Sequence, residues 1–512
     1  MSIWRKKPIE AFQADAKKND LNRVLTRWGL TSLGIGAIIG GGIFTLTGIA
    51  AHDHAGPALA ISFIIAGVGC LFASLCYAEF SSVLPVEGSA YAYSYGTVGE
   101  LFAWIIGWNL ILEYMMGATT VAVAWSGYFE KLLHQLNIHL PYWIMNDPVT
   151  AIEKAEKMGI PYQGFAFNLP ALIITWIVTS ILYKGIKEAA KTNNLIVILK
   201  VAVVLFVIIV GAFFINTENY APFVPERVID ENGAGHYGWS GIVTAATIVF
   251  FAYIGFDAVS TQAGEAINPK KDVPFAIVMS LVICTILYII VSLVLTGMVK
   301  YNELDMKAPV ASAFEGVGMP WATILITVAA VAGLTSVMLV MMLGQTRIFL
   351  GMAKDGLLPK GMFGKLHPEY KTPYKSTILV GGIISVVAAL TPIDKVSEMC
   401  SMGTLLAFAM ISLAVMVLRI KQPNLERPFK TPAIFIVGPL GALFNFGLMY
   451  FVRPETWIAF LCWSALGILV YFLYSRKNSH LNEYAFESSL KGHDSVLNAS
   501  EESDENKSPK NG

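Results

Sequence analysis

Long apolar segments alternate with short polar connections along most of the chain. A helix that crosses a membrane needs about 20 mainly apolar residues. Twelve segments approach or exceed this length, at about 30–50, 57–84, 100–128, 168–184, 193–215, 240–264, 274–299, 318–347, 374–391, 396–418, 433–452 and 455–475. The prolines at or near their starts, where a missing N–H costs least, are Pro57, Pro170, Pro274, Pro320 and Pro439. The pattern predicts twelve transmembrane helices in an all-α polytopic membrane protein.

Composition agrees with this class of protein. Of the 512 residues, 55% are hydrophobic and 14% are charged, and the mean hydropathy is +0.59. A soluble domain carries more charge than this. Residues 1–27 lack the apolar core and cleavage site of a signal peptide. The zero net charge gives no support for a nucleic-acid partner, and all five cysteines lie in apolar runs without the spacing of metal ligands.

The positive charges fall mainly on one side of the predicted membrane. Connections and ends on the N-terminal side hold 27 of the 36 Lys and Arg residues, against eight on the opposite side. Because cytoplasmic loops are enriched in Lys and Arg, we expect both termini to be cytoplasmic. The polar tail after residue 475 has few large apolar residues and is expected to be disordered.

Two predicted helices carry matching interruptions. "GIGAIIGGGIF" begins at Gly34 and places three glycines in a row, Gly40, Gly41 and Gly42, inside the first segment. "VFFAYIGFDAVS" places Gly255 inside the sixth segment. Successive helical residues point about 100° apart, so three glycines do not form one packing stripe. A matched pair of interrupted helices indicates an inverted-repeat transporter that binds its substrate at the midplane. Gly34 and Gly36 have helix packing as an equal alternative.

Ionisable residues inside a membrane are candidates for function. Lys200 lies within "LIVILKVAVVLF" and must pair, contact carbonyls or lose its proton. It either exchanges a proton during transport or fixes neighbouring helices. Glu113 faces a pocket or is a protonated acid bonded to a neighbouring helix. Asp257 caps the second half of its helix, contacts substrate or carries protons.

The eighth segment adds further polar candidates. Ala332, Thr335 and Ser336 share one helix face, and the two hydroxyls either bond back to their own helix or face Lys200 or an ion. The thioether of Met341 suits ordinary packing or a pocket wall. Arg347, at the predicted end of this segment, is expected to anchor the helix at the membrane interface.

These residues together resemble the cationic amino acid transporter family, in its bacterial form, within the amino acid–polyamine–organocation superfamily. The resemblance covers about residues 20–475. It rests on motifs in the expected order: "GIGAIIGGGIF", "YAEFSSVLPVEGSAYAYSY" (77–95), "GWNLILEY", "FFAYIGFDAVSTQAGEAINP" and "MMLGQTRIFLGMAKDGLLP".

The resemblance implies a particular division of the chain. Its parts are a cytoplasmic segment (1–27), a first inverted repeat of five helices (28–215), a second repeat of five (240–418), two extra helices (433–475) and a cytoplasmic tail (476–512). It implies a monomeric transporter in the bacterial cytoplasmic membrane that imports L-amino acids with protons and needs no cofactor or metal. Its partners would be the amino acid, the proton and membrane lipid.

The resemblance also implies roles for single residues. The N–H groups of Gly41 and Gly42 would bind the substrate carboxylate, and the carbonyls of Ile38, Phe251 and Ile254 would bind its ammonium. Gly40 and Ala252 belong to the same two stretches of the expected substrate site. Lys200 would occupy an ion position near Gly34, Ala332 and the hydroxyl of Ser336 or Thr335. Met341 would wall the side-chain pocket, with Glu113 and Asp257 near it.

Two departures from the family pattern bear on the substrate. Gly41 stands where the family often has Ser or Thr, so a hydroxyl is lost from the carboxylate site. Met341 stands where relatives that move arginine and lysine tend to have a small residue. This favours small neutral amino acids such as alanine, with cationic ones still open. An exchanger on the same fold and a non-transporting amino acid sensor are the alternatives. A membrane-embedded enzyme lacks support, because no metal set or nucleophile–base pair appears on adjacent segments.

Overall fold

The computed structural model describes residues 5–7, 25–84, 89–162, 164–184, 186–229, 235–306 and 308–481, which are mostly helical. The first half contains α2 (Arg27–Ile38), η1 (Gly42–Leu46), α3 (Thr47–Ala50), η2 (Ala51–Ala55), η3 (Gly56–Ala58), α4 (Leu59–Val83), α5 (Ser89–Thr97), α6 (Glu100–Gln135), α7 (Tyr142–Met145), α8 (Pro148–Met158), α9 (Leu169–Lys184), α10 (Ile186–Gly211), η4 (Ala212–Phe214) and η5 (Thr217–Tyr220).

The second half begins with a two-stranded antiparallel ribbon and continues as helices. The ribbon pairs Val228 with His236 and Ile229 with Gly235. Its elements are β1 (Val228–Ile229), β2 (Gly235–His236), α11 (Gly238–Phe250), η6 (Phe251–Tyr253), η7 (Asp257–Glu265), α12 (Pro269–Met298), η8 (Tyr301–Glu303), α13 (Pro309–Gly316), α14 (Pro320–Lys354), η9 (Lys360–Gly364), α15 (Tyr374–Leu390), α16 (Ile393–Lys421), α17 (Ile434–Tyr450), α18 (Pro454–Val470), η10 (Tyr471–Ser475) and α19 (Arg476–Asn478).

Every apolar segment expected to span a membrane is helical in the structure. Eight helical segments of the described chain are long and apolar enough to cross a membrane, and three shorter apolar helices are α9, α15 and α17. One of the eight, Arg27–Val83, contains the first two expected segments, because helical turns continue from η1 through η3 into α4.

Several helices extend past the apolar segments that predicted them. α6 continues to Gln135 and α14 to Lys354, since polar residues at a helix end keep the same backbone hydrogen bonds as apolar ones. Pro274 was expected near a helix start, but α12 begins five residues earlier, at Pro269, and holds Pro274 inside it. Pro439 likewise lies inside α17. A proline in the first turns removes few helical hydrogen bonds.

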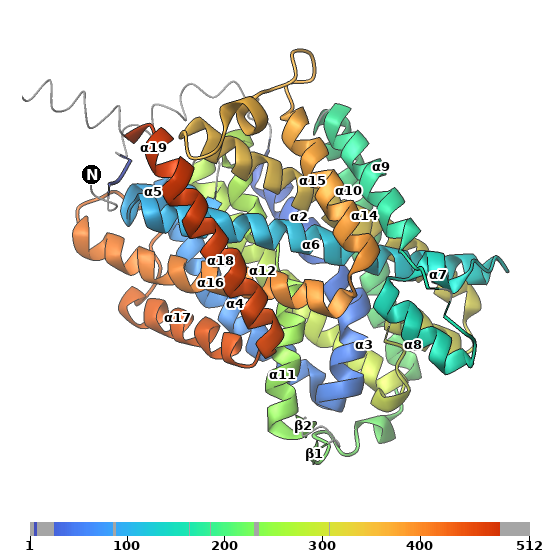
Figure 1. Ribbon diagram of the computed structural model, residues 1–512. Helices are drawn as coiled ribbons and strands as arrows, with labels where there is room; N and C mark the ends of the chain where they lie inside the picture. Colours follow the sequence, from blue (N-terminus) through green and yellow to red (C-terminus); the bar gives the residue numbers. More distant parts are fainter. Residues whose placement is uncertain are drawn as a thin grey trace, which may run out of the picture.

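The helices form two packed groups. One contains α6, α14 and α16, and the other contains α2, α4, α11 and α12. α6 crosses the middle of the molecule (Figure 1) and packs against α14 and α16. α12 packs against α4 and α2, and α11 packs against α4. The first interrupted helix therefore lies in one group with α4, α11 and α12. α10, which carries Lys200, contacts α14, α12 and α2, so it touches both groups.

The two ends of the described chain meet beside α5, at the upper left of Figure 1. The Arg5 guanidinium pairs with the Glu100 carboxylate, 3.2 Å between Nη2 and Oε1. The same carboxylate accepts bonds from Tyr471 (3.0 Å) and Ser479 (2.7 Å). Lys7 pairs with Asp355 at 2.7 Å.

The expected N-terminal segment and tail are thus partly ordered. Residues 5–7 pack against the helices, and the chain stays packed through Leu481. Order therefore continues six residues past 475, because Ser479 is buried against Glu100. The rest of the expected tail, residues 482–512, lies outside the described residues.

Candidate functional site

The first interrupted helix breaks at Ile39 and Gly40. α2 ends at Ile38, and Ile39 has an extended backbone with φ −73° and ψ 101°. Helical turns resume at Gly41, and η1 then follows as a π-helix from Gly42. The end of α2 therefore presents carbonyl groups, and the start of the next turn presents N–H groups, at the same depth of the molecule.

The second interrupted helix breaks at Ile254 and Gly255. η6 ends at Tyr253, Ile254 is extended with φ −61° and ψ 134°, and η7 begins at Asp257. Gly255 has φ +120°, a conformation that L side chains rarely adopt. The two predicted interruptions are therefore present. The first is shorter than the three glycines predicted, because Gly41 and Gly42 are already helical.

The two breaks lie against each other. A Cβ added to Gly42 would lie 2.2 Å from the Cα of Ala252, and one added to Gly255 would lie 3.0 Å from the backbone of Ala37. A Cβ on Gly40 would lie 2.7 Å from Val337. The position of Gly41 is roomier, with its nearest neighbours, Ala124 and Leu334, at 3.6 Å. Close approach of two backbones therefore requires glycine at Gly42, whereas Gly41 has space for a side chain.

Lys200 reaches the end of α2 from α10. Its side chain is fully buried. The ammonium group donates to the carbonyl of Gly36 and, at 2.9 Å, to that of Ile39. A helix end leaves its last carbonyls without intrahelical partners, so Lys200 supplies the donors that two of these carbonyls lack.

Two tyrosine hydroxyls bond to other carbonyls of the interrupted helices. Tyr288 of α12 lies 2.8 Å from the carbonyl oxygen of Ile38 and 3.0 Å from that of Ala252. Tyr128 of α6 donates to the carbonyl of Phe44 in η1. We did not identify either residue from the sequence. The only available signal was a phenol within an apolar run, which needs a hydrogen-bond partner when it is buried.

The residues expected around Lys200 contact different neighbours. The stem of Lys200 packs beside Gly333 of α14, where an added Cβ would lie 3.4 Å from its Cδ. Gly34 packs against Ser280 and Val259. The Thr335 hydroxyl accepts a bond from Trp125 at 3.0 Å and donates to the carbonyl of Val331. Ser336 is buried, and Ala332 is half-buried.

Two buried acids lie at the other side of the second break. Asp257 of η7 accepts a bond from the Tyr114 hydroxyl at 2.7 Å through Oδ2. Glu113, the residue before Tyr114, is fully buried in α6. Among the described residues, neither carboxyl oxygen of Glu113 nor Oδ1 of Asp257 has a hydrogen-bond partner. Buried polar atoms without partners are rare and costly, so these atoms are available to a ligand or a proton.

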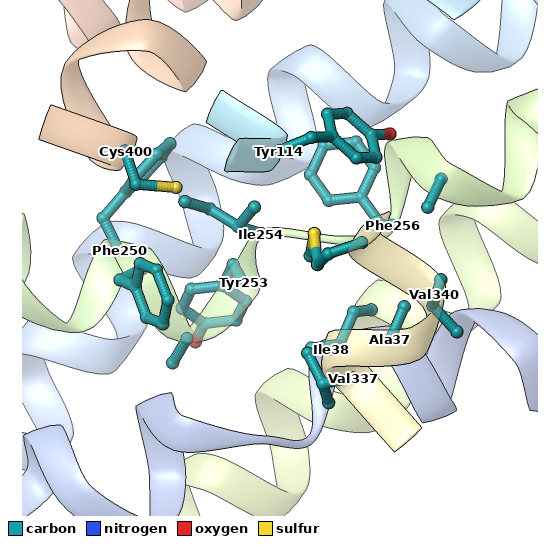
Figure 2. Close-up of a cluster of buried hydrophobic side chains, with 14 of the residues drawn as sticks. Ala37, Ile38, Tyr114, Phe250, Tyr253, Ile254, Phe256, Val337, Val340 and Cys400 are labelled. Carbon is teal, nitrogen blue, oxygen red and sulfur yellow. The ribbon is translucent and has the colours of Figure 1, made fainter. Parts of the chain in front are cut away.

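Apolar and sulfur-containing side chains surround the breaks. Figure 2 shows Ile254 on the extended stretch, among side chains that come from α2, α6, α14 and α16. Ile38, Tyr114, Val337 and Cys400 are among them. A Cβ on Gly117 would meet the sulfurs of Cys400 at 3.4 Å and Met341 at 3.6 Å. Met341 therefore lies close to Cys400, which belongs to this cluster. Phe251, Ala252 and Ile254 are all buried.

Comparison with known proteins identifies the family. The family description "Amino acid permease" matches residues 25–474. The chain belongs to the amino acid permease family. This confirms the resemblance noted from the motifs, which places it with bacterial amino acid permeases and cationic amino acid transporters.

Two relatives of this permease cover nearly its full length. It is 46% identical to the branched-chain amino acid permease BcaP of Bacillus subtilis over 94% of the chain and 99% of that protein. It is 44% identical to the methylthioribose transporter of the same organism, over 94% and 100%. It is 36% identical to the vacuolar cationic amino acid transporter 4 of Arabidopsis thaliana, over 83% and 68%. The permease is therefore a multi-pass membrane transporter and not an enzyme.

The structure contradicts the role expected of Arg347. Arg347 was expected to anchor α14 at the membrane interface, but it is only 7% exposed, and Nη1 donates to Oε1 of Gln262 in η7 at 2.6 Å. α14 continues seven residues past Arg347 to Lys354, so the apolar segment ended before the helix did. Arg347 instead joins α14 to the second half of the interrupted helix.

Proposed function

We propose that this permease is a secondary active importer of L-amino acids that couples uptake to protons. It works in the bacterial cytoplasmic membrane with twelve transmembrane helices, five plus five in inverted repeat and two more, and with both termini cytoplasmic. The family supports amino acid transport. The charge asymmetry of the connections supports the orientation, and the paired breaks support a binding site between the repeats.

Lys200 is the observation that carries proton coupling. A fully buried ammonium bonded to Gly36 and Ile39 holds the end of α2 more strongly than a neutral amine would, because its positive charge strengthens the hydrogen bonds to both carbonyls. α10 contacts both helix groups. Protonation of Lys200 therefore biases the position of α2 relative to α10, and with it the side on which the site opens.

The substrate would bind across the two breaks. Its carboxylate meets the N–H groups of Gly41 and Gly42 at the start of a helical segment, where the helix dipole favours a negative charge. Its ammonium meets the carbonyls of Ile38, Phe251 and Ile254. Transport then follows alternating access, in which α2, α4, α11 and α12 move together against the remaining helices.

Neutral aliphatic amino acids fit the surroundings of the breaks best. Apolar side chains such as Met341 and Ile254 wall the region, and one relative carries the name of a branched-chain amino acid permease. We therefore propose neutral substrates from alanine to valine. The unpartnered oxygens of Glu113 and Asp257 favour a second candidate, cationic amino acids, whose side-chain charge they would attract.

Uptake into proteoliposomes tests this function. Valine should accumulate with an inward proton gradient and lose its accumulation when the gradient is collapsed. Lys200→Ala should abolish accumulation, whereas Lys131→Ala, which removes an ion pair with Glu315 at 2.5 Å, should leave it intact. Accumulation that follows sodium and ignores protons would exclude proton coupling. Unchanged accumulation by Lys200→Ala would remove its assigned role.

Two further measurements separate the alternatives. Strict dependence of uptake on amino acid inside the vesicle would indicate an exchanger. A thermal shift with each of the twenty amino acids reports binding, because a ligand that prefers the folded state raises apparent stability. Binding without flux would indicate a sensor.

A further inference from the structure

Two histidine rings lie face to face at the end of the molecule opposite the N-terminus, beside the β1–β2 ribbon at the bottom of Figure 1. They belong to His54 of η2 and His236 of β2, with ring centroids 5.9 Å apart and an interplanar angle of 12°. Both side chains are half-buried, so protons from the medium can reach them. In the proposed orientation this end of the molecule faces the outside of the cell.

The stacked pair connects the outer parts of the two interrupted helices. The first outer part runs from η1 through α3 and ends in η2. The second is α11, which begins two residues after β2. A Cβ added to Gly241, in the first turn of α11, would lie 2.3 Å from the carbonyl oxygen of His54. The two outer parts are therefore in close backbone contact beside the stacked rings.

Hydrogen bonds add to the stacking contact. His236 Nδ1 lies 2.6 Å from the carbonyl oxygen of Asp53, and the Tyr237 hydroxyl donates to the carbonyl of His52 at 2.6 Å. Because a carbonyl only accepts, Nδ1 of His236 carries a hydrogen, and its Nε2 has none while the ring is neutral. These bonds hold η2 against β2 and the start of α11.

Adding protons to this arrangement is unfavourable. A neutral imidazole has one N–H, whereas an imidazolium has two. Nδ1 of His54 is buried and has no hydrogen-bond partner among the described residues, so a second N–H on this ring would be left without an acceptor. Two charged rings stacked at 5.9 Å would also repel each other. The stacked state therefore binds protons less readily than a state in which the rings are apart.

Other ionisable side chains belong to the elements around the pair. Those described are His52 and Asp53 in η2, Arg227 before β1, Tyr237 before α11, Lys300 before η8, and Tyr301 and Glu303 in η8. α3, η3 and α11 have none, and α4 has none in its first three turns. The carboxylate of Asp53 already lies 2.6 Å from Nδ1 of His52. One carboxylate, shared in this way, does not balance two charged rings.

We propose that His54 and His236 form a proton-sensitive latch, which holds the outer parts of the two interrupted helices together in neutral medium and releases them when the outside is acidic. The inference rests on the proposed function, because it takes this end to be external and protons to drive uptake. The stacked state binds fewer protons, so it is favoured above the ordinary histidine pKa of about 6.5 and loses stability as the pH falls through this value.

The latch differs from Lys200 in position and in effect. Lys200 is bonded to the end of α2, on the inner side of the first break. The latch lies at the outer end, and its release lets η2 and the start of α11 separate, which opens the path from the outside to the breaks. External acid therefore increases the population of the outward-open state, whereas Lys200 couples the proton to the movement of substrate.

Hydrogen exchange of the protein in detergent tests the latch without transport. Peptides that cover residues 51–56 and 235–241 are compared at about pH 5.5 and about pH 7.5, with exchange times corrected for the intrinsic effect of pH. We expect protection to fall about tenfold at the lower pH, the effect of one group that titrates one pH unit above it. In His54→Phe, which keeps a ring in the stack but cannot titrate, protection should be nearly the same at both pH values.

His139→Phe is the matched control. Its ring lies 4.9 Å from that of His134 in the connection after α6, but both rings are exposed, so water can solvate their charges. The control should keep the pH response of the original protein in both peptides. His54→Gln is a second variant that stays neutral, for use if phenylalanine prevents folding, and it should also show no response to pH.

Valine uptake into proteoliposomes measures the functional consequence. With the internal pH fixed, the external KM should fall on external acidification in the original protein and in His139→Phe, and this fall should be much smaller in His54→Phe. An equal pH response of His54→Phe and the original protein in either measurement, no response in the original protein, or loss of the response in His139→Phe would overturn the inference. Failure to bind or transport any amino acid, with the exchange response intact, would instead overturn the proposed function.

Discussion

Glu79 and Glu113 are both fully buried carboxylates on long helices, yet their surroundings are opposite. Glu79, near the end of α4, accepts two bonds of 2.8 Å from the Arg419 guanidinium and one of 2.8 Å from the N–H of Thr431. Arg427 lies 3.2 Å from the same carboxylate. In the part of the chain that the structure describes, Glu113 has no hydrogen-bond partner for its carboxyl group.

The difference distinguishes a region whose polar groups bond to one another, around Glu79, from a region whose polar groups can bind a ligand, around Glu113. Around Glu79 the carboxylate is paired with two guanidinium groups and accepts the N–H of Thr431, which ties the connection after α16 to α4. Around Glu113 and the two breaks, carbonyls share donors and carboxyl oxygens lack them. Buried atoms without partners are costly for stability alone, so we expect the region around Glu113 to serve binding and the region around Glu79 to serve structure.

The largest effect is expected from Glu79→Gln. The amide keeps the shape of the side chain but leaves two guanidinium groups near α4 without their counter-charge. Breaking a buried pair from one side costs about 3–5 kcal/mol, so the free energy of unfolding should fall by about this amount. Thermal unfolding in detergent, measured beside Glu113→Gln, checks the prediction. Equal melting temperatures for the two variants would refute the proposal that Glu79 is structural and Glu113 is not.

A smaller loss is expected from Gly42→Ala, at the breaks. The added methyl group would lie 2.2 Å from a backbone atom of Ala252, so the two interrupted helices must separate. Overpacking costs about 1–3 kcal/mol, and valine binding should be lost with it. Gly127→Ala is the control, because an added Cβ at this position of α6 would meet no other atom within 4 Å. If both variants bind valine normally, the close approach of the breaks is unimportant.

The smallest change in stability is expected from Glu113→Gln. Among the described residues Glu113 has no ion pair to break, so the free energy of unfolding should stay within about 1 kcal/mol of the original or rise, as a neutral group is easier to bury. Valine uptake should nevertheless fall severalfold. A fall in melting temperature as large as that of Glu79→Gln would show that Glu113 has a structural role.

Hydropathy and glycine content were enough to predict the helices and their interruptions. Twenty apolar residues are required wherever a helix crosses a membrane, and three glycines in a row are unfavourable in a regular helix. These constraints act locally, so they are visible in sequence. They also indicated the family, through motifs that lie on the interrupted helices.

The partners of the polar groups could not be predicted in the same way. Lys200 stood out as a charge in an apolar run, but its two acceptors are backbone carbonyls 164 and 161 residues away, and every residue has a carbonyl. Tyr288 sits in an apolar run where its ring is ordinary core packing. Arg347 was misplaced because its acceptor, Gln262, comes from an irregular helix distant in sequence. Such pairs depend on the tertiary arrangement.

The partners of Glu100 constrain the order in which the molecule assembles. Its carboxylate receives Arg5, which is made before it, and Ser479, which is made 379 residues after it. A ribosome adds residues in order, and the early part of a chain folds first. The nascent protein must therefore hold this acid with an incomplete set of donors while every later helix is made. The hydrogen bonds around Glu100 are consequently completed late in biogenesis. They join the first part of the chain to be synthesised, near Arg5, to one of the last, near Ser479.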